Sequence, residues 1–192
     1  MPRLFTGIEI PEEQREDIAR LRMPLPGGSK WVEPENLHLT LRFAGDISNA
    51  QAAELSDRLA GISADAFELR LAELGTFGGN EPRSLWVGVA PSPELDALAR
   101  ATERAARACG LPAEARAFKP HVSIAKLRYT TPDAVARVLG RIGAFRSEPF
   151  LVGRFVMFSA KPNTGGGPYV VETAFPLRGG EFANYQDIDG GW

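Results

Sequence analysis

The stretch NLHLTLRFAG, residues 36–45, places a histidine and a threonine two positions apart in a run of leucines. Side chains alternate between the two faces of a β-strand, so His38, Thr40 and Arg42 are predicted to share one face. The leucines and Phe43 would share the other face. The stretch therefore predicts a strand with one apolar face against a core and one polar face that can carry chemistry.

A second stretch, KPHVSIAKLR at residues 119–128, is a near copy of the first and contains the only other histidine of the chain. By the same alternation His121 and Ser123 share a polar face, with Val122 and Ile124 opposite. With average residue usage, the chance that both histidines are followed by an apolar residue, a Ser or Thr and another apolar residue is roughly one in a thousand. The two motifs are therefore predicted to serve one function.

The remaining elements follow from apolar patterns and capping residues. Seven segments predict β-strands, at residues 4–10, 37–43, 67–74, 85–90, 121–127, 150–158 and 169–177. Four helices are predicted between them, one starting near residue 11 and the others over residues 48–61, 92–110 and 131–142. Each of the last three begins at a serine or threonine, residues that are preferred at helix N-caps.

The order of these elements repeats along the chain. It predicts internal repeats at about residues 3–77 and 83–178, within a single two-lobed domain that covers residues 1–178. If helices cover the apolar side of each sheet, the two polar motifs face a common cleft. Residues 163–168 are predicted to form a hairpin turn, and the Gly- and acid-rich residues 179–192 are a candidate disordered tail.

Composition excludes several classes of protein. The chain has 22 basic and 24 acidic residues in 192, and this balance argues against the long cationic track that non-specific duplex binding requires. No segment has the length or hydropathy of a signal peptide or a membrane span, so a cytoplasmic location is expected. The single cysteine, Cys109, allows no internal disulfide, and nothing indicates an obligate oligomer, so a monomer is expected.

Two imidazoles and two hydroxyls without a Cys/His cluster favour paired general acid and base catalysis. One neutral imidazole would take a proton from water and the other, protonated, would give one to a leaving oxygen. The hydroxyls of Thr40 and Ser123 would hold a phosphoryl group between them. A nucleophilic serine is disfavoured because there is no GxSxG elbow, and a two-histidine metal site would need a third ligand that no spacing suggests. No metal or other cofactor is therefore expected, and two imidazoles predict a bell-shaped rate profile centred about pH 6–7.5.

The two motifs with their flanks, WVEPENLHLTLRFAGDI and FKPHVSIAKLR, resemble the two-histidine phosphoesterase superfamily. They are most similar to its bacterial and archaeal RNA 2′,3′-cyclic phosphodiesterases, historically called 2′-5′ RNA ligases. The resemblance extends from RLFTGIEIPEE near the start to PYVVETAFPL before the tail. It implies a bilobal α+β fold with pseudo-two-fold symmetry, in which two mainly antiparallel sheets face a central cleft and helices lie on the outer faces.

The same resemblance implies an activity. It is the metal-independent opening of a 2′,3′-cyclic phosphate on RNA or a nucleotide to a 2′-phosphomonoester, a step that can run backward as 2′-5′ ligation. His38 would be the proton donor to the leaving 3′-oxygen and His121 the acceptor that activates water. The residues alone leave these two roles open. Two positions depart from the family: Ser123 stands where threonine is usual, and Lys126 where many relatives carry arginine.

Five residues are candidate contacts to the substrate, which would be an RNA end or a small nucleotide. They are Arg42, Lys126, Lys119, Phe118 and Trp31. Arg42 has the right alternation, whereas Lys126 points away from His121 and would reach a phosphate only if its strand bulges. Each candidate has a plainer alternative, a solvated surface cation or an aromatic core residue. The alternative function from another class is a nucleotide-binding or RNA-end-binding module that keeps the cleft without turnover.

Overall fold

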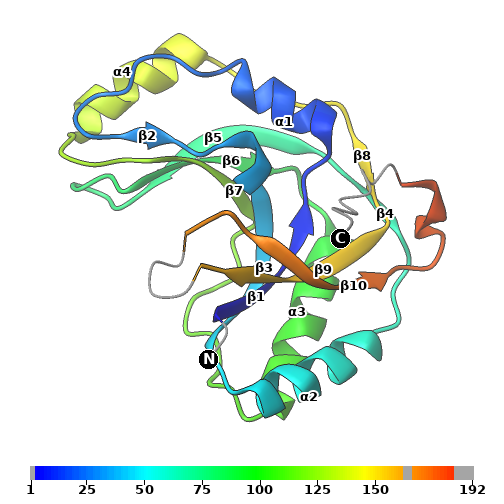
Figure 1. Cartoon of the computed structure of the whole chain (residues 1–192). Helices are drawn as coiled ribbons and strands as arrows, with labels where there is room; N and C mark the ends of the chain where they lie inside the picture. Colours follow the sequence, from blue (N-terminus) through cyan, green and yellow to red (C-terminus); the bar gives the residue numbers. More distant parts are fainter. Residues whose placement is uncertain (1–2, 162–165, 184–192) are drawn as a thin grey trace, which may run out of the picture.

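A computed structural model describes residues 3–161 and 166–183, which form a mixed α+β structure of four helices and ten strands (Figure 1). The strands are β1 (Arg3–Glu9), β2 (Lys30–Trp31), β3 (His38–Asp46), β4 (Phe67–Leu69), β5 (Leu71–Phe77), β6 (Ser84–Val89), β7 (His121–Lys126), β8 (Phe150–Val152), β9 (Arg154–Ala160) and β10 (Val170–Pro176). The helices are α1 (Glu12–Ala19), α2 (Asn49–Ala60), α3 (Pro93–Ala108) and α4 (Pro132–Ile142), with 3-10 turns η1 (Pro34–Asn36) and η2 (Gly180–Phe182). None of the helices within these described ranges is long and apolar enough to cross a membrane.

Eight strands form one antiparallel sheet in the order β10-β9-β1-β3-β7-β6-β5, with β2 paired to β7. β3 and β7 meet at a single residue pair, Leu39 opposite Val122. We call β10, β9, β1 and β3 the first lobe, and β2, β7, β6 and β5 the second lobe. The predicted α+β fold with two antiparallel sheets is confirmed, and the pairing of β3 with β7 joins the two sheets into one.

Each lobe takes strands from both halves of the sequence. β9 and β10 come from the second half and complete the first lobe, because β9 pairs with β1. β5 comes from the first half and pairs with β6 in the second lobe. The predicted repeats therefore do not correspond to one lobe each, and this exchange of strands ties the lobes together without a linker.

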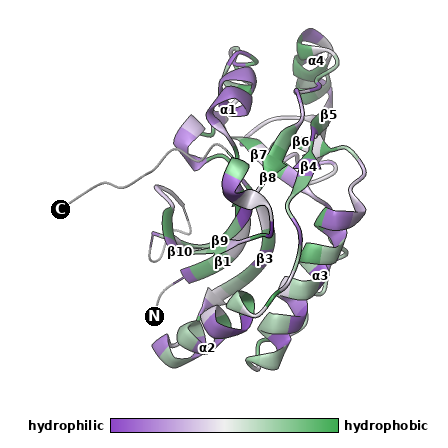
Figure 2. Ribbon diagram, turned by 90° about the vertical axis from the view of Figure 1, so that its right-hand side faces the viewer, coloured by the Kyte–Doolittle hydropathy of each residue, from purple (hydrophilic) through white to green (hydrophobic). Residues whose placement is uncertain are grey.

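Helices cover the outer sides of both lobes. Figures 1 and 2 show α2 and α3 beside the first lobe and α1 and α4 at the opposite end, beside the second. Three predicted caps are confirmed: Ser48, Ser92 and Thr131 each accept a hydrogen bond from the backbone N–H three residues later, at 3.2, 3.2 and 3.3 Å. Each satisfies an N–H that has no partner within its helix. At α1, Pro11 precedes the first turn and supplies no side-chain cap.

Three features of the structure differ from the predicted elements. The segments expected at 67–74 and 150–158 are each divided in two, because β4 and β8 pair with one another in a separate small sheet. The two-residue strand β2 is too short to leave an apolar pattern. Within the predicted tail, η2 packs on the β8–β9 break, where a Cβ on Gly153 would lie 2.5 Å from the carbonyl oxygen of Gly180. Residues 184–192 of that tail, and residues 163–165 of the predicted turn at 163–168, lie outside the described residues.

The main core lies between the sheet and the helices. The strand residue directly after each motif histidine belongs to it, and Leu39, Val122 and Ile124 are at most 1% exposed. A second, smaller cluster of Phe5, Val156, Phe158 and Ala160 packs on the opposite face of the first lobe, with Tyr169 and Val171 against it. The face of the first lobe opposite the main core is therefore aromatic.

Candidate active site

Both motif strands contain a β-bulge directly after their hydroxyl residue. In β3, Gly7 faces Thr40 and Thr6 faces Arg42, so Leu41 is an extra residue. In β7, Trp86 faces Ser123 and Leu85 faces Ala125, so Ile124 is extra. A bulge shifts the alternation of side chains by one residue, so the residues beyond it point to the other face.

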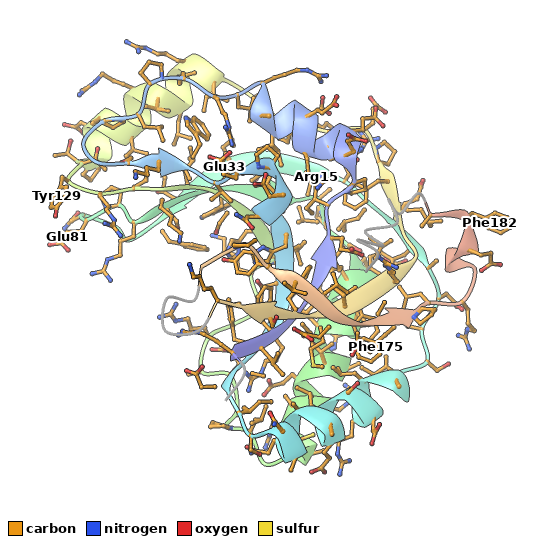
Figure 3. All side chains as sticks on the ribbon, in the orientation of Figure 1. Arg15, Glu33, Glu81, Tyr129, Phe175 and Phe182 are labelled. Atoms are coloured by element: carbon orange, nitrogen blue, oxygen red, sulfur yellow. The ribbon has the colours of Figure 1, made fainter. Side chains whose placement is uncertain are left out.

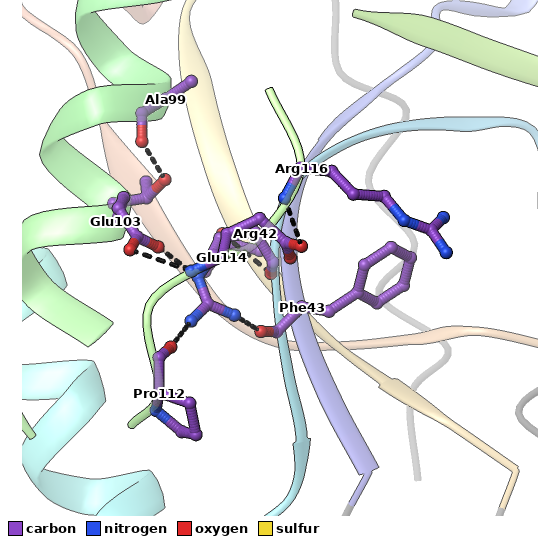
Figure 4. Close-up of polar contacts among 9 residues, drawn as sticks. Arg42, Phe43, Ala99, Glu103, Pro112, Glu114 and Arg116 are labelled. Atoms are coloured by element: carbon purple, nitrogen blue, oxygen red, sulfur yellow. Dashed lines mark hydrogen bonds and ion pairs between the residues drawn. The ribbon is translucent and has the colours of Figure 1, made fainter. Parts of the chain in front are cut away.

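The bulge in β3 reverses the prediction for Arg42 and Phe43. Figure 4 shows the two side chains leaving β3 on opposite sides, with Arg42 directed at α3. Arg42 forms an ion pair with Glu103 and donates to the carbonyl of Pro112, and its side chain is 10% exposed. Phe43, expected in the core, is 58% exposed and lines the pocket. The structure therefore places Arg42 as a structural ion pair away from the site, and Phe43 in the site.

Lys126 is expected to reach the site only if its strand bulges, and β7 does contain a bulge before this residue. Alternation from His121 points Lys126 away from the site, and the extra residue Ile124 turns it back. Lys126 lines the same pocket as His121 and Ser123. A bulge next to a site commonly re-aims a side chain in this way.

A pocket of about 650 Å³ lies where the two lobes meet and contains all four predicted catalytic residues: His38, Thr40, His121 and Ser123. Trp31 also lines it, although its indole N–H donates to the carbonyl of Met23 at 2.8 Å. Residues that sequence patterns did not indicate complete the wall, among them Arg3, Phe5, Lys30, Phe43, Ser84 and Tyr169.

The structure does not bring Phe118 or the Lys119 side chain to this pocket wall. Phe118 is 38% exposed and is not among the residues that line it. The Lys119 ammonium lies 4.7 Å from the centre of the Trp86 ring and 5.5 Å from that of Phe77, as in a cation–π contact. The backbone of Lys119, by contrast, takes part in the site through its carbonyl group.

The two histidines are held in the same way. Nδ1 of His38 lies 2.8 Å from the carbonyl oxygen of Asn36, and Nδ1 of His121 lies 2.7 Å from that of Lys119. A carbonyl oxygen only accepts, so Nδ1 carries the hydrogen in both rings. Nε2 is then the nitrogen that gains or loses a proton, with the ring orientation fixed from behind. Each motif thus provides one oriented imidazole.

Aromatic rings surround both imidazoles. His38 lies 4.8 Å from the ring of Phe5 and 4.7 Å from that of Tyr169, between ring centres, and His121 lies 4.8 Å from Phe77. Trp86 also lies beside His121. Its indole packs against Gly75, and a Cβ on Gly75 would lie 2.2 Å from the indole. Only glycine permits this close approach of ring and backbone.

Burial lowers the pKa of both histidines from the ordinary value. For His38, desolvation is the main cause, the hydrogen bond to Asn36 opposes it, and the charge of His121 lowers the pKa further. For His121, desolvation again dominates, the hydrogen bond to Lys119 opposes it, and the positive charge of Lys119 lowers the pKa further. Both groups therefore favour the neutral form at pH 7 and titrate on the acid side of their usual range.

Among the residues that the structure describes, no three His, Cys, Asp or Glu side chains are grouped so that they could hold a metal ion.

Comparisons with known proteins agree with this geometry. The model of the LigT-like phosphoesterase family matches residues 8–86 and again residues 87–169. An RNA 2′,3′-cyclic phosphodiesterase of Aeropyrum pernix is 39% identical over 116 residues, which are 59% of this chain and 64% of that protein. A protein of the same name from Aquifex aeolicus is 30% identical over 184 residues, 92% of this chain and 98% of its own.

Solved structures are similar as well. E. coli LigT in complex with 3′-AMP superposes with a TM-score of 0.73 at 26% identity, over 92% of this chain and 97% of that one. The resemblance inferred from the two motifs is thereby confirmed. Two consecutive family matches cover most of the sequence, and each contains one motif histidine in the shared pocket, so the chain belongs to the LigT-like phosphoesterase family.

Proposed function

We propose that this protein hydrolyses 2′,3′-cyclic phosphates at RNA ends or on nucleotides to 2′-phosphomonoesters, with His38 and His121 as general acid and base. The observation that carries the proposal is the pocket that contains both imidazoles, each oriented by a backbone carbonyl, together with Thr40 and Ser123. The curated relatives are named RNA 2′,3′-cyclic phosphodiesterases, so the class of enzyme, a phosphoesterase that acts by hydrolysis, rests on the family.

The proposed reaction moves two protons. Nε2 of His121 accepts a proton from water as the water oxygen attacks phosphorus. The bond between phosphorus and the 3′-oxygen breaks, and Nε2–H of His38 donates its proton to that leaving oxygen. The 2′-oxygen keeps the phosphoryl group. The same groups catalyse the reverse step when a 5′-hydroxyl replaces water, and this would give 2′-5′ ligation.

Other residues of the pocket would bind the phosphate and the nucleoside. The hydroxyls of Thr40 and Ser123 lie on the motif strands and can donate to non-bridging phosphate oxygens. Lys126 lines the same pocket, and its positive charge would attract an anionic substrate. The exposed ring of Phe43 offers a stacking surface for a base, as aromatic side chains commonly do for unpaired nucleotides. E. coli LigT has been solved with 3′-AMP and with phosphate, ligands that match these two kinds of contact.

The test is hydrolysis of a nucleoside 2′,3′-cyclic phosphate in the presence of EDTA, with identification of the product. Wild type should form the 2′-phosphate, and His38→Ala or His121→Ala should each lose about 10²–10⁴ in rate. Arg100→Ala, an exposed arginine of α3 that does not line the pocket, is the matched control and should keep full activity.

Two results would count against the proposal. Wild type that binds 3′-AMP and leaves the cyclic phosphate intact would be a nucleotide-binding module. Activity that EDTA abolishes and a divalent cation restores would contradict metal-independent catalysis. Monomeric state and cytoplasmic location stay predictions, which size-exclusion chromatography and cell fractionation can check.

A further inference from the structure

Two lysines face one another at one end of the pocket. Lys30 of β2 lies opposite Lys126 of β7 in the antiparallel ladder, and Lys126 lies opposite Ser84 of β6. All three residues line the pocket that contains the histidines. They form a row of hydrogen-bond donors across three strands, which we call the lysine row.

Opposed lysines weaken a strand pair in the absence of an anion. Like charges directly opposite on adjacent strands are destabilising. No described carboxylate forms an ion pair with either lysine. Glu33, which lines the same pocket, and Glu81 pair instead with Arg22 and Arg83, at 3.4 and 3.7 Å; both glutamates are labelled in Figure 3. A lysine on a short edge strand, such as Lys30 on β2, often prevents aggregation. That role does not explain why Lys126, which the bulge in β7 turns into the pocket, lies directly opposite it. An anion between the two ammonium groups would relieve the repulsion.

The equivalent position in the first lobe holds no cation. There the bulge turns Phe43 toward the pocket, with Phe5 as its ladder partner in place of Ser84. The first-lobe end of the pocket therefore presents Phe43 and Phe5, with Arg3 as its cation, whereas the second-lobe end presents two opposed lysines beside Trp31. The two histidines lie between these ends. A ligand that fits both ends carries a flat ring system on one side of the reacting phosphate and a second anionic group on the other.

We propose that the lysine row binds a second phosphate of the substrate, the 5′-phosphate of the nucleotide whose cyclic phosphate lies between the histidines. Lys126 lies three positions after Ser123, about 10 Å along an extended strand and less across the bulge. A ribose joins its 3′- and 5′-phosphates over a comparable span, and the flexible lysine side chains adjust the fit. This inference rests on the proposed function and deepens it: Lys30 and Lys126 would bind the phosphate that links the terminal nucleotide of an RNA end to the preceding one.

The experiment compares the binding of adenosine 3′,5′-bisphosphate with that of 3′-AMP by titration calorimetry, so its readout does not depend on turnover. Wild type should bind the bisphosphate at least about tenfold more tightly than 3′-AMP. Lys30→Met should reduce this preference about tenfold, and Lys30→Arg should retain it because the charge is kept. The matched control Arg100→Met changes net charge equally on the other lobe and should leave the preference as in wild type.

A parallel measurement varies salt. Neutralising one phosphate with a lysine gives a contribution to the slope of log Kd against log salt of about 0.7 for single strands. The bisphosphate slope should fall by roughly that amount in Lys30→Met. An unchanged preference, or equal losses for both ligands, would overturn the lysine row as a second phosphate site.

Failure of this inference is distinguishable from failure of the proposed function. Wild type that hydrolyses a cyclic phosphate and shows no preference for the bisphosphate would refute only the second phosphate site. Wild type that prefers the bisphosphate through Lys30 and hydrolyses nothing would refute the enzyme and retain the site.

Discussion

The two lobes use the same backbone arrangement and present different side chains. In each motif strand an imidazole and a hydroxyl are followed by a bulge. The residue two positions after the extra residue of the bulge then points toward the pocket. That residue is Phe43 in the first lobe and Lys126 in the second. Similar backbones thus place two imidazoles symmetrically about one pocket. The residues after the bulges make its two ends chemically different, as are the base and the phosphate of a nucleotide.

The surroundings of the two imidazoles also differ, with aromatic rings around His38 and a cation as well as rings around His121. His38 lies among Phe5, Phe158 and Tyr169, whereas His121 has the Lys119 ammonium nearby as well as two rings. A neighbouring cation disfavours a second positive charge, which suits a base that must be neutral before it accepts a proton. Burial lowers the pKa of His38 as well, so the assignment of acid and base rests on the family resemblance and on the experiment below.

The largest expected effect separates those roles through the leaving group. A p-nitrophenolate leaving group departs without protonation, so loss of a general acid matters little for bis(p-nitrophenyl) phosphate. We expect His38→Ala to lose at least about 10² more in rate on a cyclic phosphate than on this ester, and His121→Ala to lose similar amounts on both. The reverse pattern would exchange the two assignments.

A second comparison separates Phe43 from its neighbour Arg42. Base stacking on an aromatic side chain is worth about 1–3 kcal/mol, so Phe43→Ala should raise KM roughly tenfold and leave stability nearly unchanged. Arg42→Met breaks a largely buried ion pair with Glu103 and should cost about 2 kcal/mol in the free energy of unfolding. Urea unfolding and steady-state kinetics measure the two effects. An Arg42 variant with normal stability and a raised KM would place Arg42 in the site after all.

The pH dependence tests the burial of both imidazoles. Because both pKa values are lowered, the maximum of kcat/KM should lie on the acid side of pH 6.5, toward the lower end of the range expected from unperturbed histidines. In the unfolded chain these groups protonate near pH 6.5, and in the folded protein only at lower pH. The free energy of unfolding should therefore fall as pH drops below about 6.5, because the unfolded state then binds more protons.

A variant with both histidines replaced by glutamine provides the control for this dependence. Its free energy of unfolding should vary less with pH between about 6.5 and the lowered pKa values. Equal pH slopes in wild type and variant would mean that the imidazoles are hydrated, contrary to the structure.

The smallest expected effect concerns the hydroxyl residues. Ser123→Thr restores the symmetry with Thr40 and keeps the hydroxyl, while the added methyl restricts its rotation. We expect kcat to change by no more than about twofold, whereas Ser123→Ala, which loses a hydrogen bond to a charged oxygen, should lose roughly tenfold. A large loss in Ser123→Thr would show that the second lobe has no room for the methyl group.

Local patterns in the sequence were sufficient for much of the fold. Helix starts at Ser48, Ser92 and Thr131 follow from hydrogen bonds made within four residues, so each cap could be recognised from its own segment. The polar faces of the motif strands up to Thr40 and Ser123 follow from alternation alone. The family resemblance of the two motifs added the bilobal architecture.

Long-range contacts decided the rest. A bulge is a mismatch between two strands distant in sequence, so neither the reversal at Arg42 and Phe43 nor the turn of Lys126 into the pocket was visible in one strand. The exchange of β5 and β9 between lobes likewise depends on which edges are free after folding. Lys30 entered the site through a ladder of only two residue pairs. The sequence alone specified the two imidazoles and the two hydroxyls of the site, because residue types and alternation are local. Which of their neighbours join them is a property of strand register, and register exists only once distant strands have paired.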